Sequence, residues 1–137
     1  MLDDTCDHNE LVFDCYFYES KIYISTKNNI YVVSIRFEND RFISTKNYLN
    51  LSQNVTAMSH IKDNIILGCI NGQIFIVNNE TGNIVQNIKS YSKSTINVIK
   101  TKKNSIVYLG TKVGSIIILD QNINKIKDIK ISNQSGF

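Results

Sequence analysis

The chain has 137 residues, of which 42% are hydrophobic and 20% charged, with a formal net charge of +3. This composition is that of an ordinary globular chain, excludes an intrinsically disordered one and is enough for the core of one domain. No apolar run reaches the roughly 18 residues that span a bilayer, so the sequence predicts no membrane association.

Short runs of alternating apolar and polar residues, rich in Ile, Val and Tyr, follow one another along the whole chain. Such alternation is typical of half-buried β-strands, and no segment has the 3.6-residue period of a helix. The sequence therefore predicts an all-β fold. The expected strands are Leu11–Tyr18, Lys21–Thr26, Ile30–Ile35, Arg41–Leu49, Asn54–Ile61, Ile65–Cys69, Ile74–Asn78, Ile84–Lys89, Thr95–Thr101, Ser105–Thr111, Ile116–Asp120 and Lys125–Ser132.

The strands repeat with a fixed period. The run Ile65–Asn78 aligns without a gap to Val107–Asp120, 42 residues later, and Ile30 precedes Ile74 by 44 residues. A period of this length with four strands in each unit indicates a repeat architecture. Residues 11–132 divide into three units, 11–50, 54–89 and 95–132, between an acidic flexible tail at 1–10 and a second tail at 133–137.

Glycines recur at corresponding places in the last two units. We assign five of them as structural turn glycines: Gly68, Gly72, Gly82, Gly110 and Gly114. Gly72 and Gly114 stand in short hairpins, where a positive φ costs glycine nothing. Gly68 and Gly110 come at the ends of apolar strands, where we expect them to allow tight packing against a neighbouring strand.

A unit of about 42 residues with four strands and a glycine before the third strand resembles a blade of a β-propeller. The runs Leu67-Gly68…Asn71-Gly72-Gln73-Ile74 and Thr81-Gly82 are most similar to the WD-repeat family, whose Trp-Asp pair would fall at Val77-Asn78 and Leu119-Asp120. The resemblance implies a non-enzymatic scaffold that binds other proteins through loops on rigid sheets. Three blades make an incomplete ring, since propellers close with four to eight. Further blades would come from a longer chain, another chain or a second copy.

The sequence offers no set of residues for catalysis or for a cofactor. His8 and His60 are the only histidines, and there is no Gly-rich phosphate loop and no nucleophile motif. Cys6, His8 and Cys15 could ligate zinc but lack a fourth ligand at zinc-site spacing, so no metal is predicted. We therefore expect a protein that is not an enzyme.

The best candidates for a partner-binding surface lie on loops in the second half of the chain. Asn71, Tyr91, Lys93 and Lys112 are expected to share one rim of the blades, with Lys100–Lys103 in a loop at the opposite rim. Dividing the basic residues between two rims argues against nucleic acid as the partner. Two alternatives to the protein scaffold stay open: a β-barrel carrier of a small apolar ligand, and nucleic-acid binding through the basic C-terminal half.

The location and origin of the chain can also be inferred. Cys6, Cys15 and Cys69 follow no disulfide spacing, and the first five residues contain Asp3 and Asp4 and no base, where a secretory leader would be basic. These features favour reduced thiols in the cytoplasm or nucleus. The chain has 23 Ile, 18 Asn and 13 Lys but no Pro or Trp, which suggests an AT-rich genome and gives the excess of lysine a source other than function.

Overall fold

The computed structural model describes residues 11–27, 29–89, 91 and 93–131. It confirms the all-β prediction, because the described residues form twelve strands and no helix, hence no helix that could span a bilayer. Predicted and observed ends differ by at most three residues. The strands are β1 (Val12–Tyr18), β2 (Lys21–Thr26), β3 (Ile30–Glu38), β4 (Arg41–Leu49), β5 (Val55–Ile61), β6 (Asn64–Cys69), β7 (Ile74–Asn78), β8 (Ile84–Ile88), β9 (Ile96–Lys102), β10 (Ile106–Thr111), β11 (Ser115–Asp120) and β12 (Lys125–Lys130).

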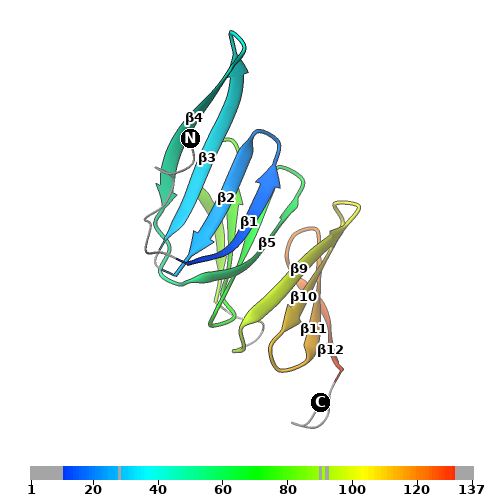
Figure 1. Ribbon diagram of the computed structural model, residues 1–137. Helices are drawn as coiled ribbons and strands as arrows, with labels where there is room; N and C mark the ends of the chain where they lie inside the picture. The colour runs from blue at the N-terminus through cyan, green and yellow to red at the C-terminus, as the bar shows by residue number, and fades with distance from the viewer. Residues whose placement is uncertain (1–10, 28, 90, 92, 132–137) are drawn as a thin grey trace. The chain divides into compact units, whose positions relative to one another are not determined.

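The strands form three separate antiparallel sheets of four, each in chain order (Figure 1). We call β1–β4 the first sheet, β5–β8 the second and β9–β12 the third. Three separate sheets rule out the alternative of a single closed β-barrel, in which neighbouring strands would continue around one wall. The chain divides into two compact units, one ending at Asn54 and one beginning at Val55.

The first unit contains the first sheet. Tyr31 and Val33 of β3 are buried, and the ring of Tyr48 lies 4.9 Å from that of Tyr31. β3 pairs with β2 only as far as Ser34, whereas β3 and β4 stay paired to Glu38 and Arg41, so their hairpin extends past the rest of the sheet (Figure 1). This extension is longer than the predicted Ile30–Ile35 strand.

The second unit is built on the packing of the second sheet against the third. Its core is a cluster of aliphatic side chains from both sheets, most of them with no exposed surface: Ala57, Ile61, Ile66, Ile74, Ile76, Ile96, Ile99, Val107, Leu109, Ile117, Leu119 and Ile123. Strand alternation explains the set, since every second residue of β10 and β11 faces the same side. Hydrophobic burial between two sheets is therefore the main force that holds this unit together.

Hydrogen bonds also join corresponding positions of the two repeats. The Ser59 and Thr101 hydroxyls, 42 residues apart, share a hydrogen bond of 3.0 Å. The Lys62 backbone N–H donates to Asn104 Oδ1, again 42 residues away, at 3.0 Å. Thr56 Oγ1 donates to the Ile96 carbonyl at 2.6 Å. The sequence repeat is thus reproduced as a structural repeat with polar links between its units.

The five glycines divide into two kinds. Gly72, Gly82 and Gly114 have positive φ values of 88°, 76° and 83° and stand in turns, as predicted. Gly68 and Gly110 lie inside β6 and β10, so their assignment as turn glycines is wrong. What they supply is space: a Cβ on Gly68 would lie 2.7 Å from Ile96 Cγ2, on the facing sheet.

The lysines of β9 also differ from the prediction. Lys100 and Lys102 belong to the strand, and Lys102 pairs with Ile106. The turn contains only Lys103, Asn104 and Ser105, because β9 and β10 remain paired to their ends. The basic loop predicted at Lys100–Lys103 is therefore mostly a strand with exposed lysine side chains.

The two described cysteines are free thiols in different surroundings. Cys15 on β1 is exposed, whereas Cys69 at the end of β6 is fully buried. Burial raises the pKa of the Cys69 thiol to about 12, because the thiolate would lose its hydration. Cys6 lies outside the described residues.

We expect a thiol reagent such as dithionitrobenzoate to modify Cys15 in the native protein and Cys69 only as the second unit unfolds. A Cys6→Ser variant leaves only the two described thiols to follow.

Because the folded pKa of Cys69 lies above its ordinary value of 9.0, burial of this thiol stabilises the fold below about pH 9, and that contribution is lost as the pH rises toward 12. Urea midpoints should therefore fall more steeply above pH 9 in this variant than in the same variant with Cys69→Ala. Urea midpoints that fall equally with pH in the two proteins would contradict the burial of the Cys69 thiol. Fast modification of Cys69 in the native protein would contradict it as well. Tyr23, whose pKa burial raises to about 12, adds a decline common to both proteins.

Candidate functional site

Two hairpin turns at corresponding positions of the repeat frame the site. In the β6–β7 turn, the Gly72 N–H donates to the Cys69 carbonyl at 3.0 Å, and Asn71 Oδ1 accepts from the Gln73 N–H at 3.0 Å. Gln73 Nε2 in turn donates to Asn87 Oδ1 at 2.6 Å. The side chain of Asn71 is thus used to shape its own turn, a role for which asparagine is favoured.

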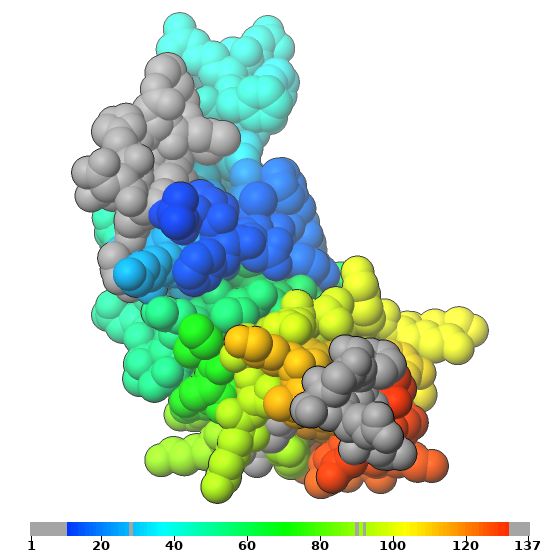
Figure 2. Space-filling view, turned by 60° about the horizontal axis from the view of Figure 1, so that its bottom comes forward, coloured from blue at the N-terminus to red at the C-terminus, as the bar shows by residue number. Residues whose placement is uncertain are grey.

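The β10–β11 turn has the same backbone geometry with different side chains. The Gly114 N–H donates to the Thr111 carbonyl at 3.1 Å, and the hydroxyls of Thr111 and Ser115 share a hydrogen bond of 2.8 Å. Lys112 and Val113 occupy the tip and are exposed. Figure 2 shows this turn, in orange, next to the green β6–β7 turn.

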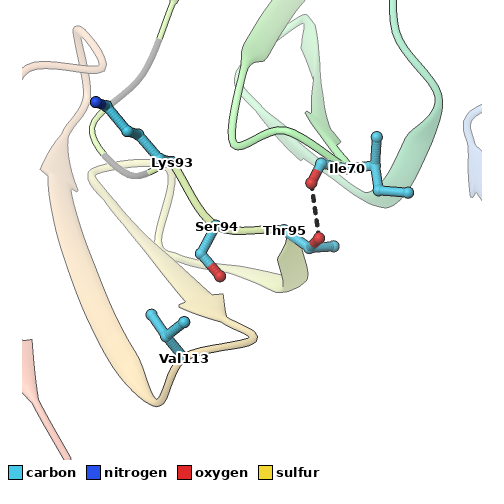
Figure 3. Close-up of a pocket in the computed structure, with 5 residues that line it drawn as sticks. All are labelled: Ile70, Lys93, Ser94, Thr95 and Val113. Atoms are coloured by element: carbon cyan, nitrogen blue, oxygen red, sulfur yellow. Dashed lines mark hydrogen bonds between the residues drawn. The ribbon is translucent and has the colours of Figure 1, made fainter.

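The segment that leads from the second sheet to the third lies between these turns and is bonded to both. Thr95 Oγ1 donates to the Ile70 carbonyl at 2.6 Å (Figure 3). The Lys112 N–H donates to the Thr95 carbonyl at 2.9 Å. The three elements border a shallow, open depression of about 430 Å³, lined by Ile70, Lys93, Ser94, Thr95 and Val113.

The depression combines apolar and cationic groups. Ile70 and Val113 are 47% and 67% exposed, although both are aliphatic residues in turns, where polar residues are usual. Lys93 and Lys112 are exposed beside them, and Figure 3 shows the Lys93 ammonium group extending away from the Thr95–Ile70 hydrogen bond. Such a surface can bury an apolar side chain while it attracts a negative charge.

The predicted partner-binding residues are only partly brought together. Lys93 lines the depression, and Asn71 and Lys112 are the sequence neighbours of its lining residues Ile70 and Val113. Tyr91, half-buried, instead packs against the core of the second unit, and its hydroxyl donates to the Ile123 carbonyl at 2.8 Å. Tyr91 is not one of the residues that line the depression.

Ile70, Ser94, Thr95 and Val113 line the site and were not predicted. A signal existed for two of them, since Ile70 and Val113 are aliphatic residues that stand two and one residues before a turn glycine. Ser94 and Thr95 carry no such signal, because their position depends on how the connecting segment crosses between two sheets.

The described residues show which chemical groups the site contains. Among the described residues, no three His, Cys, Asp or Glu side chains come together as metal ligands would. Cys6 and His8, which with Cys15 were considered as zinc ligands, lie outside the described residues. The depression itself contains one amine and two hydroxyls, with no carboxylate or imidazole to act as a base.

Comparison with known proteins shows the fold. No protein-family model matches the chain, and no curated protein matches its sequence. The chain is similar in structure to the WD40 domain of Neurospora crassa Pan2, with a TM-score of 0.66 at 13% identity over 87% of this chain and 36% of that one. It is also similar to Chaetomium thermophilum Raptor, with a TM-score of 0.71 at 12% identity over 91% of this chain and 13% of that one.

The chain therefore spans well under two thirds of the length of either of these solved structures. At such low identity the likeness concerns the fold alone. The three sheets are blades of a WD40-like β-propeller, as the repeat and its turn glycines predicted.

Proposed function

We propose that this chain is a non-enzymatic protein-interaction scaffold and that it binds an extended peptide segment of its partner in the depression between the β6–β7 and β10–β11 turns. The observation that carries the proposal is the exposure of two aliphatic side chains, Ile70 and Val113, in a depression that Lys93 also lines and that Lys112 adjoins in sequence. The WD40-like fold supports it by analogy, because propeller loops commonly serve as binding surfaces.

The chemistry of the depression defines the peptide. An apolar side chain would cover Ile70 and Val113, and a neighbouring aspartate or glutamate would lie near Lys93 and Lys112. Lysine ammonium groups are mobile point charges, so they would favour acidic peptides without imposing a fixed geometry. The partner is therefore a protein with an acidic segment that contains an exposed apolar residue.

The site needs little reorganisation to bind. The Thr95–Ile70 and Lys112–Thr95 hydrogen bonds hold the connecting segment to both turns, and Gly72 and Gly114 hold the turns themselves. A surface that is ordered before binding loses less conformational entropy on association. Binding would thus depend on shape and charge, without a covalent step and without a cofactor.

We place the scaffold in the cytoplasm or the nucleus. Cys15 and Cys69 are both free, and Cys15 is exposed, which suits a reducing compartment.

A display library of random twelve-residue peptides tests the proposal directly. We expect enrichment of peptides with an apolar residue next to Asp or Glu, and about tenfold or weaker binding of a selected peptide to Val113→Asp and to Lys93→Glu. Lys125→Glu, an exposed lysine on β12, is the matched control and should bind normally.

Peptides that bind the two site variants as well as the wild type would refute the proposal. Binding of a (dT)₂₀ oligonucleotide that falls steeply with salt and is weakened alike by Lys93→Glu and Lys125→Glu would assign the basic residues to nucleic acid instead.

A further inference from the structure

The edge strand β4 of the first sheet is open to pairing with a further strand. Among the described residues, β3 pairs with one side of β4 and no strand pairs with its other side (Figure 1). The Ile35 N–H on β3 donates to the Ser20 carbonyl, on the side of β2. Because backbone groups alternate along a strand, those of Phe42, Ser44 and Tyr48 point away from β3. An added strand could therefore form hydrogen bonds along β4.

The fourth strands of the other two sheets are protected against such pairing. β8 has five residues and β12 has six, and each has a register shift where it pairs with the third strand of its sheet. β12 also carries Lys125, Lys127 and Lys130. Short length, bulges and lysines all keep edge strands from pairing with other chains. β4 instead has nine residues, keeps one register with β3 from end to end and contains Lys46 as its one lysine.

The side chain of Lys46 leaves this edge accessible. Its ammonium group lies over the rings of Tyr31 and Tyr48, 5.6 Å and 5.7 Å from their centroids. A cation held by two aromatic faces lies across the surface of the sheet. It does not point along the edge, where it would oppose an incoming strand.

Two aromatic pairs lie on one side of the β3–β4 hairpin. Phe37 packs on Phe42 with ring centroids 5.0 Å apart, and Tyr31 packs on Tyr48 at 4.9 Å. The two-residue turn 39–40, with positive φ at both residues, fixes the register that sets Phe37 opposite Phe42. Phe37, Phe42 and Tyr48 are 62%, 77% and 56% exposed. The hairpin therefore presents aromatic surface at both ends of its edge strand.

We propose that β4 pairs antiparallel with β4 of a second copy of this chain, about a two-fold axis through Thr45. The backbone groups that face the edge belong to every second residue, so the axis must pass through a residue. An axis at Thr45 pairs all nine residues of β4 and sets two threonines opposite each other, a favourable cross-strand pair. An axis at Ser44 would leave Tyr48 and Leu49 without partners in β4, and one at Lys46 would set two lysines opposite each other.

This register joins the aromatic pairs of the two copies. Phe42 stands opposite Tyr48 of the second copy, and both lie on the side that carries Phe37 and Tyr31. The Phe37–Phe42 pair of one copy thus continues into the Tyr48–Tyr31 pair of the other as one row, and the two-fold axis repeats the row. Aromatic cross-strand neighbours stabilise a sheet, and this pairing would cover the exposed surface of Phe42 and Tyr48.

The charges of β4 also suit pairing with itself. Arg41 stands opposite Leu49 of the second copy, and Lys46 stands opposite Ser44, so cations do not face each other directly. Both the aromatic and the charged residues of β4 are therefore complementary to β4 itself. This self-complementarity favours a second copy as the occupant, because a two-fold contact brings the same surface of both chains together.

Disulfide trapping tests the register. In a Cys6→Ser, Cys15→Ser background, which leaves only the buried Cys69, Thr45→Cys should form a linked pair on mild oxidation. Residues opposite each other at this position have Cα atoms about 4.5 Å apart, within the range of disulfides. Asn47→Cys, exposed on the same side of β4, is the matched control. Its two copies would lie about 14 Å apart and should not be linked.

Sedimentation equilibrium of the full 137-residue chain measures the affinity. We expect the mass of two chains at micromolar concentration. Ser44→Lys sets a lysine opposite Lys46 of the second copy and should raise the dissociation constant about tenfold, whereas Ser44→Glu at the same position should not raise it. Adding Lys46→Glu to Ser44→Lys should restore most of the affinity. Far-UV circular dichroism checks that each exposed substitution leaves the sheets folded.

A single-chain mass at every concentration up to about 100 µM, a range in which weak specific pairs are detectable, would overturn the proposal and leave β4 to a strand of a different protein. Equal linking of the two cysteine variants would also overturn it, as would equal effects of Ser44→Lys and Ser44→Glu. Val113→Asp should not alter the mass, because β4 belongs to the first unit and the depression to the second. Failure of this proposal is therefore distinct from failure of the peptide site.

Discussion

Replacing Leu109 with alanine should lower the free energy of unfolding of the second unit by about 2–5 kcal/mol. Leu109 is fully buried on β10 and belongs to the cluster that joins the second and third sheets. Its removal would leave a cavity between two sheets that the strand hydrogen bonds keep from collapsing. Urea denaturation followed by far-UV circular dichroism measures the loss.

Val113→Ala is the control for this substitution. Val113 is 67% exposed on the β10–β11 turn, so its truncation should change stability by no more than about 0.5 kcal/mol. A loss below about 1 kcal/mol for Leu109→Ala, well under the range for buried leucines, would mean that the two sheets do not share a core.

Gly68→Ala should destabilise the second unit by about 1–3 kcal/mol, because one added methyl group overfills the contact between the sheets. A Cβ on Gly68 would lie 2.7 Å from Ile96 Cγ2 and 2.9 Å from Ile96 Cβ. Since Cβ is fixed to the backbone, no rotamer of Ile96 relieves the clash and β9 itself must move. The hydrogen bond from Thr56 to the Ile96 carbonyl would be strained by the same shift.

Gly110→Ala is the matched comparison, because Gly110 is the corresponding glycine of the third sheet. Its added methyl group would clash within one sheet, and not between two sheets. A Cβ on Gly110 would meet Val98 Cγ1 at 2.6 Å, within its own sheet. Val98→Ala removes that atom, so the double variant should recover most of the loss. Gly68→Ala combined with Ile96→Ala should recover nothing, because Ile96 Cβ remains and core contacts are lost. Recovery in the second pair would show that Gly68 is not needed for the approach of the sheets. The urea midpoints of the two single and two double variants measure these losses and recoveries of stability.

Much of the fold could be predicted because short-range patterns determine it. Alternation of apolar residues located all twelve strands, and the 42-residue repeat grouped the last eight into two units of four. Gly72 and Gly114 located the hairpins that frame the site, since a positive φ selects glycine whatever the surroundings. Lys93, found from sequence by its position on a rim, does line the depression.

Ile123 occupies a turn position that its residue type does not predict. It has a φ of 67°, which a β-branched residue strongly disfavours, and its N–H donates to the Asp120 carbonyl as that of Gly82 does to the Asn78 carbonyl. The 42-residue offset of the repeat would instead match Gly82 with Asn124. The turn accepts isoleucine because its side chain is buried in the core and its carbonyl is bonded to Tyr91.

By itself, the sequence determined the number, type and grouping of the strands, because these follow from residue alternation, turn chemistry and a repeat that the chain carries along its length. Only the tertiary structure decided which residues of the third repeat are core and which are surface. Leu109 is buried and Tyr108 is partly exposed although both are large and lie in one strand, because the second sheet covers only one of the two sides. Contacts between segments far apart in the chain likewise decided that Tyr91 packs against the core and that Val113 lines the depression.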